Sequence, residues 1–489
     1  MSLSTICGVT VLRSLIISLI GVFLCQRLSA LIDRSETRYT LFLWFLILAP
    51  ILVPELIIGY AWSLLTTQLI HYPILAEVVY STLVLSRVVP VGLICYQMAA
   101  QPQISGEADF IRKSASKTGT EISRVPVQWS FFLRKTLVRI LPVWCLLFLL
   151  AFQEFEIASL LYMNSWTVWI FDVQAGGVPV RETLVYLIGP LIIEALLLAG
   201  VLYLLRCLEQ RPDYLQQHRN SKVNRWRQIL AVCYLAVATC CVVLVPLGML
   251  GWGGLISLKS VLQNRLQIMG TLQECSWGLL YATTSGIAAW GLATCFFNRR
   301  QSHLIKLVGL ICCIPGLLGS LTLALVIASF FLTQTGNWLY GTPVPVLMGF
   351  VLYLFPRAVF LKLVFQKQED TDSLFLAHLL NRSTCPHQAE NGGRLLWVSR
   401  GRMQYWAVAV LAFWVYWDVT ISSILAPGSG MTSAVRLYGL MHYGQTSVLS
   451  AISLISCCVP VLLALILFPV VRNVWIRFSN QSELKQFVS

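Results

Sequence analysis

Four carboxylates lie in long apolar runs of the sequence, where an acidic side chain is costly. Glu154 and Glu156 lie in one such run, Glu55 follows Pro54 in another, and Asp418 lies in a third. Inside a membrane, such groups usually face a cavity or a partner. Glu154 and Asp418 could face each other across a pathway and suit a cationic solute such as ferric iron. Equally, each could pair with a polar neighbour and serve only the structure.

A second group of polar residues favours structural contacts between helices. Glu55 either caps a helix broken at Pro54 or lines a pathway. Arg87 is expected to pair with Glu55 or with Glu77. Glu194 stands alone in an apolar run, and we expect it to form a hydrogen bond with a neighbouring helix.

Residues for metal or nucleotide chemistry are sparse. Cys385, His387 and His378 lie close in sequence, but no second pair of ligands follows at a spacing typical of zinc. No Gly-x-x-x-x-Gly-Lys-Ser/Thr phosphate loop occurs, so the chain is not expected to hydrolyse ATP itself. Most of the 15 cysteines lie in apolar runs, where they pack as small apolar side chains. We expect no catalytic site, no cofactor, no bound metal and no structural disulfide.

The chain that must position these residues is too apolar for a soluble protein. Of its 489 residues, 57% are hydrophobic and 11% are charged, whereas a soluble protein of this length covers its surface with polar groups. The apolar runs can cross roughly 30 Å of hydrocarbon as helices. They predict an all-α, polytopic membrane bundle of about eleven spans, at residues 15–32, 41–68, 74–98, 139–163, 183–206, 227–252, 276–298, 304–331, 342–366, 403–426 and 446–472.

Basic side chains indicate the orientation of these spans. The net charge is +14, and Lys and Arg gather in alternate loops. Basic loops face the cytoplasm, which explains the charge without nucleic acid as a partner. The alternation predicts a multi-pass protein of the inner (cytoplasmic) membrane, with its N-terminus outside and its C-terminus in the cytoplasm.

The two halves of the chain resemble each other at an offset of about 261–266 residues. The matched positions are Pro54 with Pro315, Pro90 with Pro356, and Glu154 with Asp418. Prolines inside spans kink helices, so matching positions indicate two parallel pseudo-repeats with a pathway between them. We expect a first transmembrane domain of five spans at 1–206, a cytoplasmic linker at 207–226, and a second transmembrane domain of six spans at 227–489.

A long polar segment at residues 106–139 separates the third and fourth expected spans. Ala108, Ile111 and Ala115 recur there at helical spacing, and Val125-Pro126 ends the run. The pattern predicts a short amphipathic helix on the cytoplasmic face.

This segment resembles the coupling helix of the permease subunits of ABC importers, which carries a Glu-Ala-Ala … Gly … Ile-x-Leu-Pro motif. Glu107-Ala108 is similar to the start of the motif, Ser114-Ala115-Ser116 to its Gly-Ala-Ser, and Val125-Pro126 to its Leu-Pro. Phe148–Leu161 and Leu437–Gly444 also look like segments of the fused, two-domain iron(III)-type permeases.

The resemblance implies a type I permease fold and ATP-driven import of a small solute by alternating access. Its partners would be an ATP-binding subunit, as a dimer, and a periplasmic solute-binding protein that meets loops 164–182, 253–275 and 427–445, with the lipid bilayer around the chain. The residues that it implies for ATPase contact are Glu107, Ala108, Ile111, Ser114, Ala115 and Gly119 in the first half, and His378, Leu379 and Arg382 in the second. The pathway would be lined by Glu154, Glu156, Asp418 and Glu55.

Other functions stay open. An ion- or proton-coupled secondary transporter would also have repeats and intramembrane carboxylates. A degenerate permease with a scaffolding role would fit the second segment, Ala377–Ser383, which keeps neither Glu-Ala-Ala nor Leu-Pro. A membrane transferase would require a dense cluster of His, Asp, Glu or Arg at one membrane face, and the sequence offers none.

Overall fold

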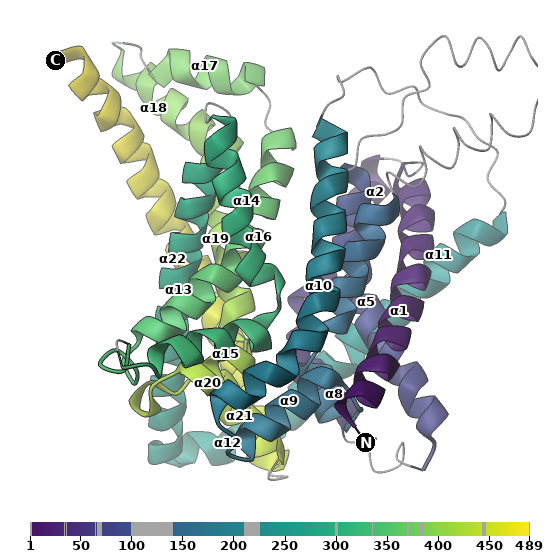
Figure 1. The fold of residues 1–489 in the computed structure, drawn as a ribbon. Coiled ribbons are helices and arrows are strands. Elements are labelled where there is room, and N and C mark those ends of the chain that lie inside the picture. The colour runs from purple at the N-terminus through teal and green to yellow at the C-terminus, as the bar shows by residue number, and fades with distance from the viewer. Residues whose placement is uncertain are drawn as a thin grey trace, which may run out of the picture. The chain divides into compact units, whose positions relative to one another are not determined.

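The computed structural model describes residues 2–33, 35, 37–63, 65, 71–98, 140–209, 225–298, 302–334, 336–368, 371–381, 383, 385–442 and 446–488. Within these ranges the fold is all-helical and contains no strand, as the sequence predicts (Figure 1). Several of the expected ATPase-contact residues lie outside the described residues: Glu107, Ala108, Ile111, Ser114, Ala115, Gly119 and Arg382.

The chain divides into two compact units, Met1–Gly177 with Val185–Leu247, and Val178–Leu184 with Gly248–Ser489. The helices of the first unit are α1 (Leu3–Ile32), α2 (Thr37–Leu52), α3 (Glu55–Ser63), α5 (Pro73–Met98), α8 (Glu156–Leu160), α9 (Trp166–Ala175), most of α10 (Val180–Glu209), α11 (Arg225–Ala238) and the π-helix η1 (Thr239–Leu244). A helical stretch at 140–152 precedes α8.

Besides the start of α10, the second unit comprises the chain from Gly248, within α12, onward. Its helices are most of α12 (Val245–Gln263), α13 (Arg265–Phe296), α14 (His303–Leu317), α15 (Ser320–Phe331), α16 (Val344–Gln368), α17 (Thr371–Asn381), α18 (Pro386–Leu396), the π-helix η2 (Trp397–Gly401), α19 (Arg402–Tyr416), α20 (Thr420–Leu425), the 3₁₀ turn η3 (Gly428–Gly430), α21 (Ser433–His442) and α22 (Thr446–Val488).

Residues 227–247, which the sequence pattern groups with the second half, pack within the first unit. There α11 contacts α1, and η1 contacts α2. The Trp62 indole N–H donates to the Cys241 carbonyl at 3.0 Å. The helix that follows the linker is therefore held by the helices of the first unit.

Eight helices in the described part of the chain are long and apolar enough to cross a membrane, and counting each of two bent pairs as one span raises the number to ten. The bent pairs are α2–α3, at 76°, and α14–α15, at 98°. These ten correspond to ten of the eleven expected spans, although the first helix already begins at Leu3. The expected span 403–426 is instead divided into α19 and α20, and neither is long enough to span alone.

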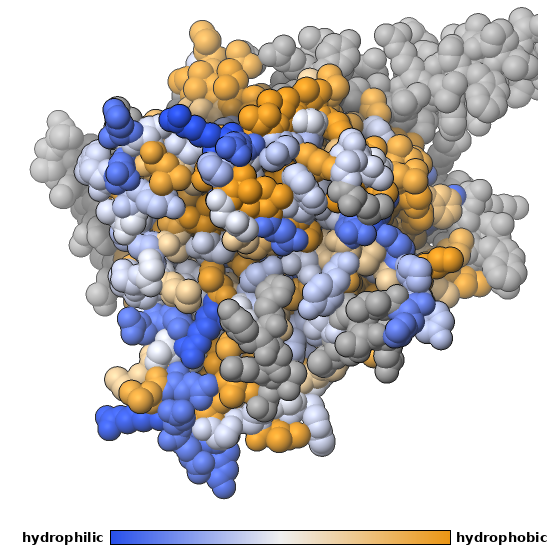
Figure 2. Space-filling view, turned by 60° about the horizontal axis from the view of Figure 1, so that its bottom comes forward, coloured by the Kyte–Doolittle hydropathy of each residue, from blue (hydrophilic) through white to orange (hydrophobic). Residues whose placement is uncertain are grey.

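The surface of α1 shows why these helices suit lipid. Leu12, Ile16, Leu19 and Phe23 are exposed along one face, with Leu12 61% exposed, while the opposite face packs into the unit. A helix that is apolar on its exposed face as well as its buried one is typical of a membrane span. Figure 2 shows hydrophilic and hydrophobic residues side by side on the face that is lowest in Figure 1. In length and composition, these helices could cross a membrane several times.

The three segments expected as external loops are largely helical. Residues 164–182 contain α9, and 427–445 contain η3 and α21. Residues 253–275 form the end of α12 and the start of α13, with only Asn264 between the two helices. Asn264 caps α13, because its side chain accepts the N–H of Gln267 at 3.4 Å. These segments were expected as loops between spans, and apolar and helix-forming residues continue helices through them.

Candidate functional site

The candidate span Ile140–Leu160, which carries Glu154, is interrupted near its end. Its helix ends at Phe152, and the short helix α8 begins at Glu156. The break frees backbone groups that need partners in an apolar environment. The Phe152 carbonyl accepts the Trp166 indole N–H at 2.8 Å, and the Glu154 carbonyl accepts the Thr167 hydroxyl at 2.8 Å. The start of α9 therefore stabilises the break.

Glu154 caps α8 with both carboxylate oxygens. Oε1 accepts the N–H of Ile157 at 2.5 Å, and Oε2 accepts that of Ala158 at 3.0 Å. Helix N-termini leave such N–H groups unsatisfied and favour a nearby anion. Glu156 is buried in the first turn of the same helix. Glu154 thus has the polar partners that the structural interpretation of the sequence expects.

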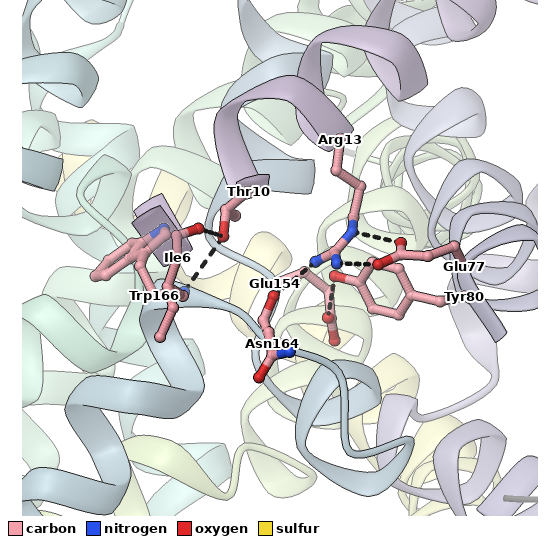
Figure 3. Close-up of polar contacts among 8 residues, drawn as sticks. All are labelled: Ile6, Thr10, Arg13, Glu77, Tyr80, Glu154, Asn164 and Trp166. Carbon is pink, nitrogen blue, oxygen red and sulfur yellow. Dashed lines mark hydrogen bonds and ion pairs between the residues drawn. The ribbon is translucent and has the colours of Figure 1, made fainter. Parts of the chain in front are cut away.

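A charged network joins this cap to α1 and α5 (Figure 3). Arg13 donates from Nε and Nη2 to the two oxygens of Glu77, at 2.8 and 2.5 Å, and from Nη1 to the Asn164 carbonyl at 3.0 Å. Its guanidinium lies 4.9 Å from the ring centroid of Tyr80, and the Tyr80 hydroxyl donates to Glu154 Oε2 at 3.0 Å. One cation therefore connects α1, α5 and the segment before α9.

A second contact fixes α1 at the same place. The Trp166 backbone N–H donates to the Thr10 hydroxyl at 3.3 Å, and this hydroxyl donates to the Ile6 carbonyl at 2.9 Å (Figure 3). Sequence reasoning missed Arg13, because the first span was expected to begin only at residue 15. The signal was present: Arg13 is the one cation in the apolar stretch Ile6–Cys25.

Glu55 begins α3, directly after the bend in α2–α3. Arg87 of α5 forms an ion pair with Glu55, and the distance between Arg87 Nη2 and Glu55 Oε1 is 2.6 Å. Arg87 Nη1 also donates to the Pro50 and Val53 carbonyls that the bend frees. The pairing of Arg87 with Glu55 is one of the two predicted from the sequence, and Glu77 pairs with Arg13 instead.

Asp418 occupies the break between α19 and α20 in the second unit. Its Oδ1 accepts the N–H of Ile421 at 2.8 Å, and its carbonyl accepts the Ser422 hydroxyl at 2.8 Å.

In this unit α20 packs against α15, and in the first unit α8 packs against α3. A Cβ at Gly59 of α3 would come within 2.4 Å of Leu160 Cδ1, so α3 and α8 are in close contact.

The second unit also ties its first long helix to the helix after the break. Arg436 of α21 forms an ion pair with Glu274 of α13, and the distance between Arg436 Nη1 and Glu274 Oε1 is 2.7 Å. Tyr416, the last residue of α19, accepts the Ser433 hydroxyl at 3.0 Å, at the start of α21. A Cβ at Gly278 of α13 would lie 3.0 Å from the Tyr416 ring. None of these three contacts was expected from the sequence.

Glu194 of α10 differs from the other carboxylates. It is 1% exposed, and its side chain faces Gln153, at the break before α8. Gln153 supplies a side-chain hydrogen bond to Glu194 from the neighbouring span, which is the kind of contact that the sequence predicts.

The expected second coupling segment is a pair of helices. α17 and α18 pack side by side, and a Cβ at Gly392 of α18 would come within 2.4 Å of the Asn381 backbone nitrogen. His378 and Leu379 lie on α17 and are exposed, together with Phe375 and Leu376. Figure 1 shows α17 and α18 at the end of the second unit opposite to α20. Exposed apolar side chains therefore lie at the end of the second unit that is opposite to α20.

The four carboxylates expected along the pathway are divided between the two units. Glu154, Glu156 and Glu55 lie in the first unit, and Asp418 lies in the second. Among the described residues, no group of three or more His, Cys, Asp or Glu could hold a metal ion. Chemically, these charged side chains supply hydrogen-bond partners to backbone groups at the helix breaks.

Comparisons of the chain with protein-family models, with curated proteins and with solved structures find no match. The resemblance to ABC permeases therefore stays a hypothesis carried by the residues and by the local geometry of the two units.

Proposed function

We propose that the chain is the permease subunit of an ATP-driven importer that moves a small solute across the inner membrane by alternating access. An ATP-binding subunit, as a dimer, would bind the cytoplasmic segments, and a periplasmic solute-binding protein would bind the opposite side. The C-terminus would lie in the cytoplasm and the N-terminus outside.

One observation carries the proposal: both units contain the same unusual local arrangement. In each, a bent helix pair is followed by a long helix and then by a span that breaks at a carboxylate, which caps a short helix. In each, that short helix packs against the second limb of the bent pair. Two separate folds with these features in the same order are best explained by parallel repeats, which are common in transporters.

The long helices before and after the polar segments support a coupling role. α17 and α18 lie between α16 and α19, as residues 106–139 lie between α5 and the helix that precedes α8. Exposed Phe375, Leu376 and Leu379 on α17 would supply the apolar contact that an ATPase groove requires. Closure of the ATPase would then move α16 and α19 together.

The resemblance suggests ferric iron as the solute. To bind iron, Glu154 and Asp418 would both have to give up hydrogen bonds that they form in this structure. Glu154 uses both oxygens to cap α8, and Asp418 uses Oδ1 to cap α20. Iron binding there would open the caps and expose the first N–H groups of two helices. We therefore propose that Glu154, Glu156, Asp418 and Glu55 shape the pathway by holding the bent helices, and that another set of groups contacts the solute.

The experiment is affinity purification of the tagged chain from its native membranes in mild detergent, followed by measurement of ATP hydrolysis. We expect ATPase activity to co-purify and to be lost when residues 107–119 are deleted. Leu379→Ser should weaken it, whereas Leu304→Ser, at an exposed leucine of α14, should not. ATPase activity that survives the deletion at full level would contradict the coupling assignment.

A second candidate, a proton-coupled transporter, is favoured by Glu194. A carboxylate that is buried in a span and faces a polar side chain there is typical of proton relays. Uptake that persists without ATP, collapses with the proton gradient and is lost in Glu194→Gln would favour this function over an ATP-driven importer.

A further inference from the structure

In the second unit, helical backbone rather than a loop joins α18 to the helix that follows it. α18 ends at Leu396, the π-helix η2 follows directly, and α19 begins at Arg402, so the backbone is helical from Pro386 to Tyr416. A π-helix replaces the regular α-helical hydrogen bonds by longer-range ones, and sharp bends in helices are often found at such sites. α18 is therefore connected to α19 through one defined point of bending.

Aromatic contacts with α22 lie on both sides of η2. The ring centroid of Trp397, the first residue of η2, lies 6.0 Å from that of Trp475 in α22 and 5.7 Å from that of Phe468. Beyond η2, in α19, Tyr405 and Trp406 lie 5.4 and 5.9 Å from Phe468, again between ring centroids. All four distances are typical of favourable aromatic pairs. The later part of α22 thus holds η2, and Phe468 holds the start of α19.

α22 has its own point of bending beside η2. Pro469 lies inside α22 and has no N–H for the regular helical hydrogen bond. Phe468 and Trp475, on either side of Pro469, both contact Trp397. A Cβ at Gly401 would come within 2.5 Å of the Trp397 ring and 3.1 Å of the Trp475 ring, so glycine allows the close approach of η2 to α22. The two points of bending therefore lie side by side.

α22 connects the two ends of the second unit. α17 packs against α18, and both contact α22. Figure 1 shows the C-terminal end of α22 at the end of the unit where α17 and α18 lie. At its other end α22 begins at Thr446 and contacts α21. A movement of α22 at one end would therefore be felt at the other.

We propose that α17, α18 and the part of α22 after Pro469 form one rigid body, the hinged foot, which swings on η2 and Pro469 together. Its displacement reaches two helices at once, α19 through η2 and α22 through Pro469. The use of this hinge rests on the proposed function, in which the ATP-binding subunit moves the hinged foot and α22 carries the movement to α21. The hinge itself needs no ATPase.

The test compares spin-label distance distributions in the purified chain, with its native cysteines replaced, in nanodiscs. Labels at Leu379→Cys of α17 and Asn473→Cys of α22, both exposed, lie within the hinged foot. Labels at Leu379→Cys and Leu304→Cys, at an exposed leucine of α14, lie on opposite sides of the hinge. We expect the distribution across the hinge to be about twofold wider than that within the foot.

A substitution at Trp475 tests what holds the hinged foot together. Trp475→Ala removes the aromatic contact between η2 and the later part of α22, and should widen the distribution within the foot about twofold. Trp475→Phe keeps a ring and should restore the narrow distribution. Val474→Ala is the matched control, because Val474 is exposed next to Trp475, and it should leave the distribution unchanged.

Two results would overturn the proposal. The first is equal width within the foot and across the hinge in the parent chain. The second is a distribution within the foot that stays as narrow in Trp475→Ala as in the parent chain, or that widens as much in Val474→Ala. The measurement uses the chain alone, so absence of a co-purifying ATPase would count against the proposed function and not against the hinge.

Discussion

The ion pair between Arg13 and Glu77 allows a prediction whose sign depends on burial. The Arg13 side chain is 6% exposed, whereas that of Glu77 is 43% exposed. Glu77→Gln leaves a buried cation without its counter-ion, which costs roughly 3–5 kcal/mol in fully buried pairs. Because Glu77 is partly hydrated, we expect about 2–3 kcal/mol here. Arg13→Gln leaves only a carboxylate that water can reach, so about 1 kcal/mol is expected.

The double variant separates this reasoning from simple loss of contacts. Replacing both partners removes the uncompensated charge, and such replacements are often nearly neutral. Arg13→Gln should therefore raise the stability of the Glu77→Gln variant by about 1 kcal/mol, although it lowers that of the parent chain. Arg13 and Glu77 lie on different helices, α1 and α5, so neither substitution changes the sequence neighbours of the other residue.

The assay is thermal unfolding of the purified chain in detergent, followed by tryptophan fluorescence. About 2–4 °C is expected for each kcal/mol in a unit of this size. The control is Glu182→Gln, at an exposed position of α10, which should change stability by less than about 0.5 kcal/mol. A double variant that is less stable than Glu77→Gln, by the full effect of Arg13→Gln, would refute the reasoning.

Three further predictions concern the broken spans and their packing. Glu154→Gln should destabilise the chain by about 1–3 kcal/mol, because one of two capping oxygens becomes a donor. Asp418→Asn should cost less in the same unfolding assay, since Asn keeps an oxygen for the N–H of Ile421, and an equal cost would argue against the capping roles. Gly59→Ala should cost about 1–3 kcal/mol by overpacking against α8, whereas Gly8→Ala, with nothing within 4 Å of the new Cβ, should not.

Much of the fold followed from the sequence because it depends on local patterns. Apolar runs located the membrane helices, and Pro54 and Pro315 lie at or next to the bends of α2–α3 and α14–α15. The pairing of Arg87 with Glu55 was one of two pairings predicted from the sequence, since Arg87 lies in the next expected span after Glu55.

The breaks before α8 and α20 could not be predicted, because no proline marks them. Each depends on contacts with residues that follow later in the chain, such as Trp166 on the Phe152 carbonyl. The Arg13–Glu77 pair joins residues 64 positions apart, a distance over which periodicity carries no information. The π-helices η1 and η2 likewise have no pattern of their own in the sequence.

If the chain is the proposed ATP-driven permease, the segment that contains α17 and α18 must face the cytoplasm, and labelling of single cysteines tests this most directly. Cys385 is exposed between α17 and α18, and Ala175→Cys would place a probe at the exposed end of α9. With the other cysteines replaced, a membrane-impermeant maleimide should label Cys385 only in inside-out vesicles and Ala175→Cys only in right-side-out vesicles. Labelling of Cys385 from the outside, or of both probes from one side, would contradict the proposed permease.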